Sequence, residues 1–148
     1  MMGKIMGTLI LILMFMNLGA PPSNSIVIFE NESVNPFENL YKAICEVESS
    51  GNPLAIGDRH LKEWSYGICQ VRRSRLTDYY RRTGIRYSTS DMFDPTKAKE
   101  VFMYYCMDYN PSQFMEISRS WNGGYDWERK KSTIQYWKRV KIYLDKSN

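Results

Sequence analysis

Apolar residues recur every three or four positions in five separate stretches of this 148-residue chain, and this spacing limits it to a mainly helical fold. Turn-forming residues bound each stretch, so we expect helices over about 36–49, 74–84, 95–109, 111–123 and 132–146. The segment 57–67 between the first two is loop-like and long enough for a short hairpin. The chain is also long enough to bury one sizeable core.

The first helical stretch carries strong N-terminal signals. Asn35 is a suitable N-cap, Pro36 fits the first helical position, and Glu38 lies three residues after the cap. Ser132 and Gln135 form a capping-box pattern near the start of the last stretch. These signals predict where the first and last helices begin.

Two glutamates of the first helix, Glu46 and Glu48, are expected to differ in their surroundings. At about 100° per residue, Glu48 falls within the apolar arc and Glu46 on the opposite side. Glu48 also lies in the last turn, where the helix dipole and partial burial both favour a raised carboxyl pKa. Such a group can act as a general acid, but a glutamate that only caps the helix or pairs with an arginine fits the residues too. The arc consists of Leu40, Tyr41, Ile44 and Val47.

The N-terminal segment has the pattern of an export signal. MMGK carries one positive charge, an apolar run follows at 5–16, and small and polar residues come next. We therefore expect a secretory signal peptide, or an uncleaved anchor, over 1–25, a linker over 26–34 and one domain over 35–145. The predicted location is the periplasm, the cell envelope or the extracellular space.

Charge and cysteine content narrow the possible partners. The formal net charge is +4, which suits an anionic partner such as a cell-wall polymer. Arginine runs at 72–75 and 81–86 would also fit a nucleic acid, but the export signal argues against one. There are three cysteines, no C-x-x-C pair and a single histidine, so we expect no metal site and no cofactor.

Three short motifs occur in an order that resembles a known family. They are VESSGNPLA at 47–55, SYGICQV at 65–71 and SWNGG at 120–124. Together they resemble the Glu-Ser, Gly-Leu-Met-Gln and Ala-Tyr-Asn motifs of the soluble lytic transglycosylase family, in the lysozyme-like superfamily. MFDPTKA at 92–98 and TIQYWKRV at 133–140 resemble its middle and closing helices, so the resemblance covers about 38–144. It implies an α+β lysozyme-like domain with a short hairpin at the cleft.

The resemblance also implies a reaction. Glu48 would protonate the glycosidic oxygen between N-acetylmuramic acid and N-acetylglucosamine in peptidoglycan, and then accept the proton of the muramic acid 6-hydroxyl. The product would carry a 1,6-anhydro ring, and no water would be consumed. The chain would act as a monomer on glycan strands, with no nucleic-acid partner.

Other positions match the polar and aromatic residues of the family's cleft. Asn122 by itself also fits a helix C-cap, Gln70 a structural amide and Tyr136 a core residue. The matches depart from the family's usual residues where Trp121 replaces a tyrosine, Cys69 a methionine and Ile68 a leucine. The predicted substrate-binding residues are Ser49, Ser65, Tyr66, Gln70, Trp121, Asn122 and Tyr136.

Two alternative functions remain open at this level. A hydrolytic lysozyme on the same fold needs a second carboxylate near Glu48, and Asp58 is the best candidate. A non-catalytic module that binds glycan, or that belongs to an envelope-spanning secretion or conjugation apparatus, would need no catalytic acid. The intact Glu48 argues against that module.

Overall fold

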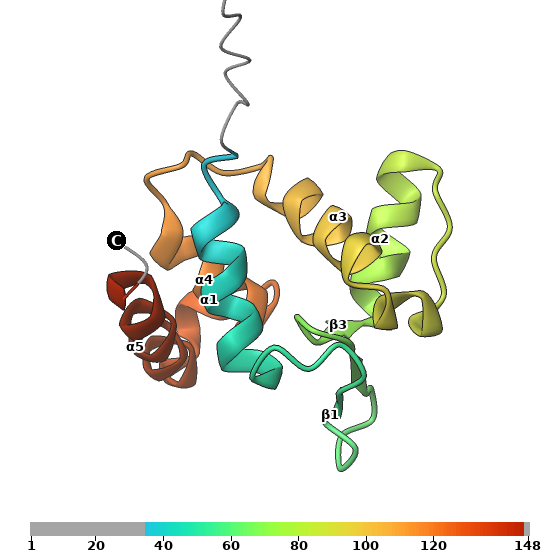
Figure 1. The fold of residues 1–148 in the computed structure, drawn as a ribbon, viewed down its shortest axis with the longest axis horizontal. Coiled ribbons are helices and arrows are strands. Elements are labelled where there is room, and N and C mark those ends of the chain that lie inside the picture. Colours follow the sequence, from blue (N-terminus) through green and yellow to red (C-terminus); the bar gives the residue numbers. More distant parts are fainter. Residues whose placement is uncertain (1–34, 147–148) are drawn as a thin grey trace, which may run out of the picture. The chain divides into compact units, whose positions relative to one another are not determined.

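The structure is a computed structural model that describes residues 35–146. The predicted signal peptide and linker therefore lie outside the described residues. The five predicted helices are confirmed, and Figure 1 shows their arrangement. They are α1 (Glu38–Ser49), α2 (Arg73–Thr83), α3 (Pro95–Cys106), α4 (Phe114–Gly123) and α5 (Lys131–Lys146), with 3₁₀ helices η1 (Thr89–Phe93) and η2 (Trp127–Arg129).

The predicted hairpin region forms a small antiparallel sheet. Its strands are β1 (Ile56–Gly57), β2 (Ser65–Tyr66) and β3 (Val71–Arg72), in the order β1-β2-β3. β1 and β2 are the expected hairpin, and β3 adds a strand that leads directly into α2. The fold is thus α+β and mostly helical, as predicted.

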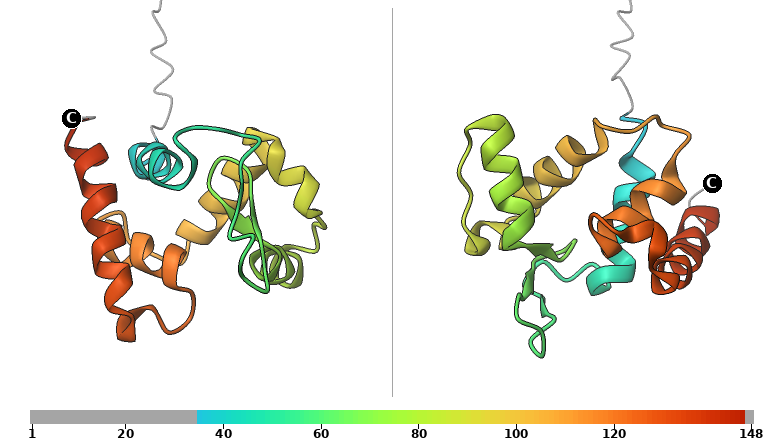
Figure 2. Two further views of the ribbon diagram at one scale, coloured as in Figure 1. Left: turned by 90° about the horizontal axis from the view of Figure 1, so that it is seen from below. Right: turned by 180° about the vertical axis from the view of Figure 1, so that it is seen from behind.

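Two groups of elements pack on either side of α3. α1 and α4 both contact α5, whereas the sheet contacts α2 and η1. α3 contacts α1 as well as α2, and Figure 2 shows it running between the two groups. One continuous core joins them, with residues of all five helices and of β3.

The apolar arc of α1 packs as its spacing predicts. Leu40, Tyr41 and Ile44 are buried, and Val47 packs against the core at its edge. Glu46 is exposed on the opposite side. Glu48 is partly buried, so the predicted difference in burial between the two glutamates is present in the structure.

The two predicted capping patterns are wrong. α1 begins at Glu38, because Asn35 forms a turn in which its side-chain oxygen accepts a hydrogen bond from the Phe37 amide at 3.0 Å. α5 begins at Lys131, before Ser132 can act as its cap. α3, in contrast, has a side-chain N-cap, since the carboxylate of Asp94 accepts a hydrogen bond from the Thr96 amide at 2.9 Å.

All three cysteines are buried with free thiols. Within the described part of the chain, no helix has the length and apolar character needed to cross a membrane.

Candidate active site

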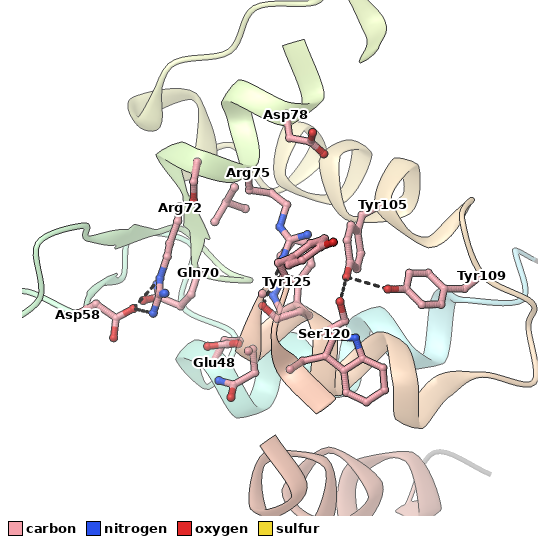
Figure 3. A pocket seen from close by; sticks show the side chains of 17 residues that line it. Glu48, Asp58, Gln70, Arg72, Arg75, Asp78, Tyr105, Tyr109, Ser120 and Tyr125 are labelled. Atoms are coloured by element: carbon pink, nitrogen blue, oxygen red, sulfur yellow. Dashed lines mark hydrogen bonds and ion pairs between the residues drawn. The ribbon is translucent and has the colours of Figure 1, made fainter. Parts of the chain in front are cut away.

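A cavity of about 660 Å³ lies where the two groups of elements meet. Its walls come from the end of α1, the sheet, α2, the residues around the end of α3, and α4 with the turn that follows it. In Figure 3, Asp58 and Arg72 lie at one end of the cavity, Tyr105 and Tyr109 at the other, and Glu48 against the lower wall. The cavity is therefore an elongated space with a carboxyl group on its wall.

Glu48 lies in the last turn of α1, and its partner comes from α5. The Tyr136 hydroxyl donates a hydrogen bond of 2.7 Å to Glu48 Oε1. Burial raises the pKa of Glu48 to about 7, although the hydrogen bond from Tyr136 lowers it. The charge of Asp58 raises this pKa further, and the charges of Arg139 and Arg72 lower it. Near neutral pH both protonation states of Glu48 are populated, as a group that gives and takes a proton requires.

Tyr136 is fixed as a donor by the same surroundings. Its side chain is buried, and burial together with the charge of Glu48 raises its pKa well above the usual value. The hydroxyl therefore keeps its proton and holds Glu48 Oε1. Glu48 Oε2 accepts no hydrogen bond from any other described residue, so it is the oxygen left for a ligand.

Gln70 is held rigidly in the wall of the cavity. Its backbone has a positive φ of 53°, which is strained for a residue with a side chain. Its amide nitrogen donates to the carbonyl oxygen of Gly67 at 2.8 Å, and its oxygen accepts from Ser65 at 2.7 Å. Gly57 packs so closely that a Cβ there would lie 2.1 Å from Gln70 Oε1. These contacts fix the orientation of the Gln70 amide.

Asp58 shares the cavity with Glu48 but is held in an ion pair. Arg72 Nη2 lies 2.7 Å from Asp58 Oδ2, and Arg72 Nε donates to the same oxygen at 3.2 Å. Asp58 also has a positive φ, of 56°. The pair keeps a carboxylate on the cavity wall with its charge largely balanced.

The opposite end of the cavity is aromatic and cationic. The guanidinium of Arg75 lies 4.1 Å from the ring centroid of Tyr105 and 4.7 Å from that of Trp121. The Tyr105 hydroxyl forms hydrogen bonds with Ser120 and, at 3.1 Å, with Tyr109. This end therefore offers hydroxyl groups and one cation along the cavity wall.

The structure brings some of the predicted site residues together and leaves others outside the cavity. Glu48, Gln70, Trp121 and Asn122 line it. Trp121 is only 7% exposed and donates from Nε1 to the Cys69 carbonyl at 3.1 Å, so little of its ring is free to stack on a sugar. Asn122, in contrast, is exposed at the cavity wall.

The remaining four predicted residues do not line the cavity. Tyr136 acts behind it through Glu48, and Ser65 through Gln70. The Ser49 hydroxyl donates to the Ile68 carbonyl at 2.7 Å, which ties the end of α1 to the loop before β3. Tyr66 faces a second cavity.

Sequence reasoning missed most of the aromatic and cationic end of the site. Arg75 lies in the arginine run at 72–75, and Tyr105 and Tyr109 lie in the predicted helical stretch at 95–109, and neither pattern indicates a role at a cavity. Exposed Tyr125, which follows the Gly-Gly end of α4, had no signal beyond its type. No group of three His, Cys, Asp or Glu residues in the described chain is arranged to hold a metal ion.

Comparisons with known proteins agree with this architecture. A chain of the crystal structure of Aeromonas hydrophila PliI in complex with Meretrix lusoria lysozyme is similar, with a TM-score of 0.57 and 23% sequence identity. The match covers 71% of this chain and 88% of that chain, and it supports the fold. A search of curated proteins found no match. The sequence profile of the transglycosylase SLT domain matches residues 26–143, most of the chain, so the protein belongs to the transglycosylase SLT domain family.

Proposed function

We propose that this protein is a peptidoglycan lytic transglycosylase. It cleaves the β-1,4 bond between N-acetylmuramic acid and N-acetylglucosamine without water, and Glu48 serves as its single acid and base. The observation that carries the proposal is the pairing of Glu48 with Tyr136, which leaves a carboxyl group of pKa about 7 on the wall of an elongated cavity. Membership of the transglycosylase SLT domain family supplies the substrate class.

The proposed reaction has two proton transfers through one group. Protonated Glu48 donates to the glycosidic oxygen as the bond to C1 of the muramic acid breaks. The resulting carboxylate takes the proton of the 6-hydroxyl, whose oxygen bonds to C1 and closes the anhydro ring. Glu48 is protonated again at the end, so the cycle consumes no water and needs no second carboxylate.

The fixed polar groups of the cavity support the orientation of a sugar chain. The Gln70 amide is locked by its neighbours, and Asn122 is exposed at the wall. The Gln70 amide nitrogen already donates to the carbonyl oxygens of Gly67 and Ala55, so its oxygen is the part that would accept from a glycan hydroxyl, whereas Asn122 offers both a donor and an acceptor. A rigid arrangement lowers the entropic cost of placing the reacting bond beside Glu48.

A hydrolytic lysozyme is the second candidate, and Asp58 favours it. This carboxylate lines the same cavity, and its charge acts on Glu48. A lysozyme would use it to direct a water molecule or to stabilise the intermediate. The ion pair with Arg72 supports the first candidate, because it occupies Asp58 Oδ2.

Digestion of purified peptidoglycan, with the products weighed by mass spectrometry, tests both candidates. We expect anhydromuropeptides, each about 18 Da (one water) lighter than the hydrolysis product, and we expect Glu48→Gln to abolish them because the amide cannot transfer the proton. Glu46→Gln is the matched control on the exposed side of the same helix and should retain full activity. Reducing-end products that also require Asp58 would establish a lysozyme instead.

The predicted export signal agrees with this substrate. Peptidoglycan lies in the cell envelope, so the proposed enzyme acts in the periplasm or outside the cell as a monomer. Association with an envelope-spanning secretion or conjugation apparatus stays a hypothesis from the sequence. If the wild-type protein released neither anhydromuropeptides nor reducing-end products, the result would contradict the proposed activity and favour the non-catalytic module.

A further inference from the structure

A second cavity, of about 830 Å³, lies on the other side of α2 from the first. α2 gives Ser74, Arg75 and Asp78 to the first cavity, but Arg73, Leu76, Thr77 and Tyr80 to the second. These two sets fall on opposite sides of a helix at about 100° per residue. The two cavities share no lining residue, so the second is a separate site.

The walls of this second cavity combine fixed and exposed aromatic rings. Tyr66 packs edge-on against Phe93 with ring centroids 6.1 Å apart, and Tyr87 stacks on a buried tyrosine of α2. Trp64 and Tyr80 are 43% and 41% exposed and line the same cavity. Exposed rings beside a hollow are typical of a binding surface and can pack on the C–H face of a sugar.

Three cations in the second cavity lack acidic partners. Lys62, Arg73 and Arg86 line it, and none forms an ion pair with a described residue. Glu63 is the single acid among the lining residues, and it binds the amide and hydroxyl of Ser74 at the start of α2. Its charge thus serves the helix terminus, and the cavity is left with an excess of positive charge.

We propose that the second cavity binds peptidoglycan through the carboxylates of its stem peptides, away from the cleaved bond. The guanidinium of Arg86 lies 4.7 Å from the ring centroid of Tyr80, which places a charge next to a flat apolar surface. A sugar that carries an acidic peptide presents these same two features side by side. The assignment rests on the proposed function, because that function supplies the polymer.

The test uses the Glu48→Gln protein, which binds without cutting, and two soluble probes. One is a disaccharide that carries a tetrapeptide stem, and the other is N,N′-diacetylchitobiose, a disaccharide that has neither a peptide nor a carboxylate. NMR of the tryptophan indole groups reads out binding, because Trp64 lines the second cavity, and Trp121 and Trp127 line the first. We expect the peptide-bearing probe to shift the Trp64 signal and the peptide-free probe, which lacks the carboxylates, to shift it far less at the same concentration.

Charge variants separate the proposal from a general effect of basic residues. Replacing both arginines (Arg73→Gln with Arg86→Gln) should weaken binding seen at Trp64 about tenfold, because two charge-assisted contacts are lost. Arg81→Gln is the matched control, since this exposed arginine of α2 lines neither cavity. Equal affinity in the double variant and the control, or an equal Trp64 shift with the peptide-free probe, overturns the proposal.

The outcome of this binding experiment can be separated from the outcome of the cleavage experiment. Binding at Trp64 together with no cleavage by the wild-type protein would sink the proposed activity but keep the second site. Cleavage by the wild-type protein with no Trp64 shift would keep the activity and sink the second site.

Discussion

Glu48 and Tyr136 form a contact in which each residue sets the protonation of the other. The hydroxyl favours the carboxylate by donating to it, while burial favours the carboxylic acid. The balance places the pKa of Glu48 at about 7, so the group is divided between its two states near neutral pH. Removing the hydroxyl alone should therefore change the pH dependence of the reaction.

Tyr136→Phe tests this balance directly. The proposed first step needs protonated Glu48, so kcat/KM of the wild type should fall as pH rises through about 7. Without the hydroxyl, the carboxylate loses a hydrogen bond, and the alkaline limb should move up by about one pH unit. A pH–rate profile measures this, and an unchanged limb with reduced activity would mean that Tyr136 only supports the fold.

At the scale of elements, a turn of the sheet and the end of α2 each depend on a glycine with positive φ. Gly67 has a φ of 76°, and a Cβ there would lie 1.8 Å from the Met92 carbonyl oxygen of η1. Gly84, after α2, has nearly the same φ, of 75°, but open space around it. The two positions separate backbone strain from steric contact.

Gly67→Ala and Gly84→Ala should therefore differ in stability. Gly84→Ala should cost about 1 kcal/mol of unfolding free energy, which is the cost of the left-handed conformation. Gly67→Ala should cost about 3 kcal/mol or more, because a backbone oxygen must also move. Denaturant unfolding of both variants measures the difference, and equal costs would contradict the close approach of Gly67 to η1.

The elements differ in how well the sequence predicted them. Helix existence and the buried side of α1 follow from apolar spacing, which is local. The first residues of α1 and α5 do not follow from the sequence patterns. Asn35 forms a turn before α1 instead of capping it, and α5 already begins at Lys131, one residue before the predicted cap. All three strands have two residues, too few for a pattern, so the hairpin of β1 and β2 was expected only from the length of the segment 57–67, and β3 was not expected.

The site shows the same division between local and distant information. The side of α1 on which Glu48 lies could be predicted, because it depends only on residue spacing within one helix. The Asp58–Arg72 pair and the placement of Arg75 against Trp121 join residues far apart in the chain, and spacing carries no information about them. Ser65 and Ser49 were predicted from motif positions. Such positions indicate residues near the cavity but not which side chains line it, and neither serine does.

For the whole molecule, a half-buried carboxyl group with a raised pKa makes stability depend on pH. The folded protein holds the Glu48 proton up to about pH 7, whereas the ordinary value of 4.5 applies to the unfolded chain. Below about pH 4.5 both states are protonated and the effect vanishes. As pH rises from there to about 7, the unfolded chain releases this proton first, so the folded protein loses stability.

Glu48→Gln should remove this loss. We expect the variant to gain about 1–3 kcal/mol of unfolding free energy relative to the wild type between pH 4 and pH 8. Chemical denaturation at several pH values measures the gain, and Glu46→Gln serves as the exposed control whose curve should run parallel to the wild type. A difference between Glu48→Gln and wild type that stays constant with pH would contradict the raised pKa.

The contact between Glu48 and Tyr136 also has a consequence for the newly made chain. The two residues are 88 positions apart, and α1 leaves the ribosome well before α5. At about 5–20 residues per second, roughly 4–18 s of synthesis separate them. A chain that ends before α5 would carry the glutamate without the tyrosine that holds it, so the Glu48–Tyr136 contact can form only after α5 has been made.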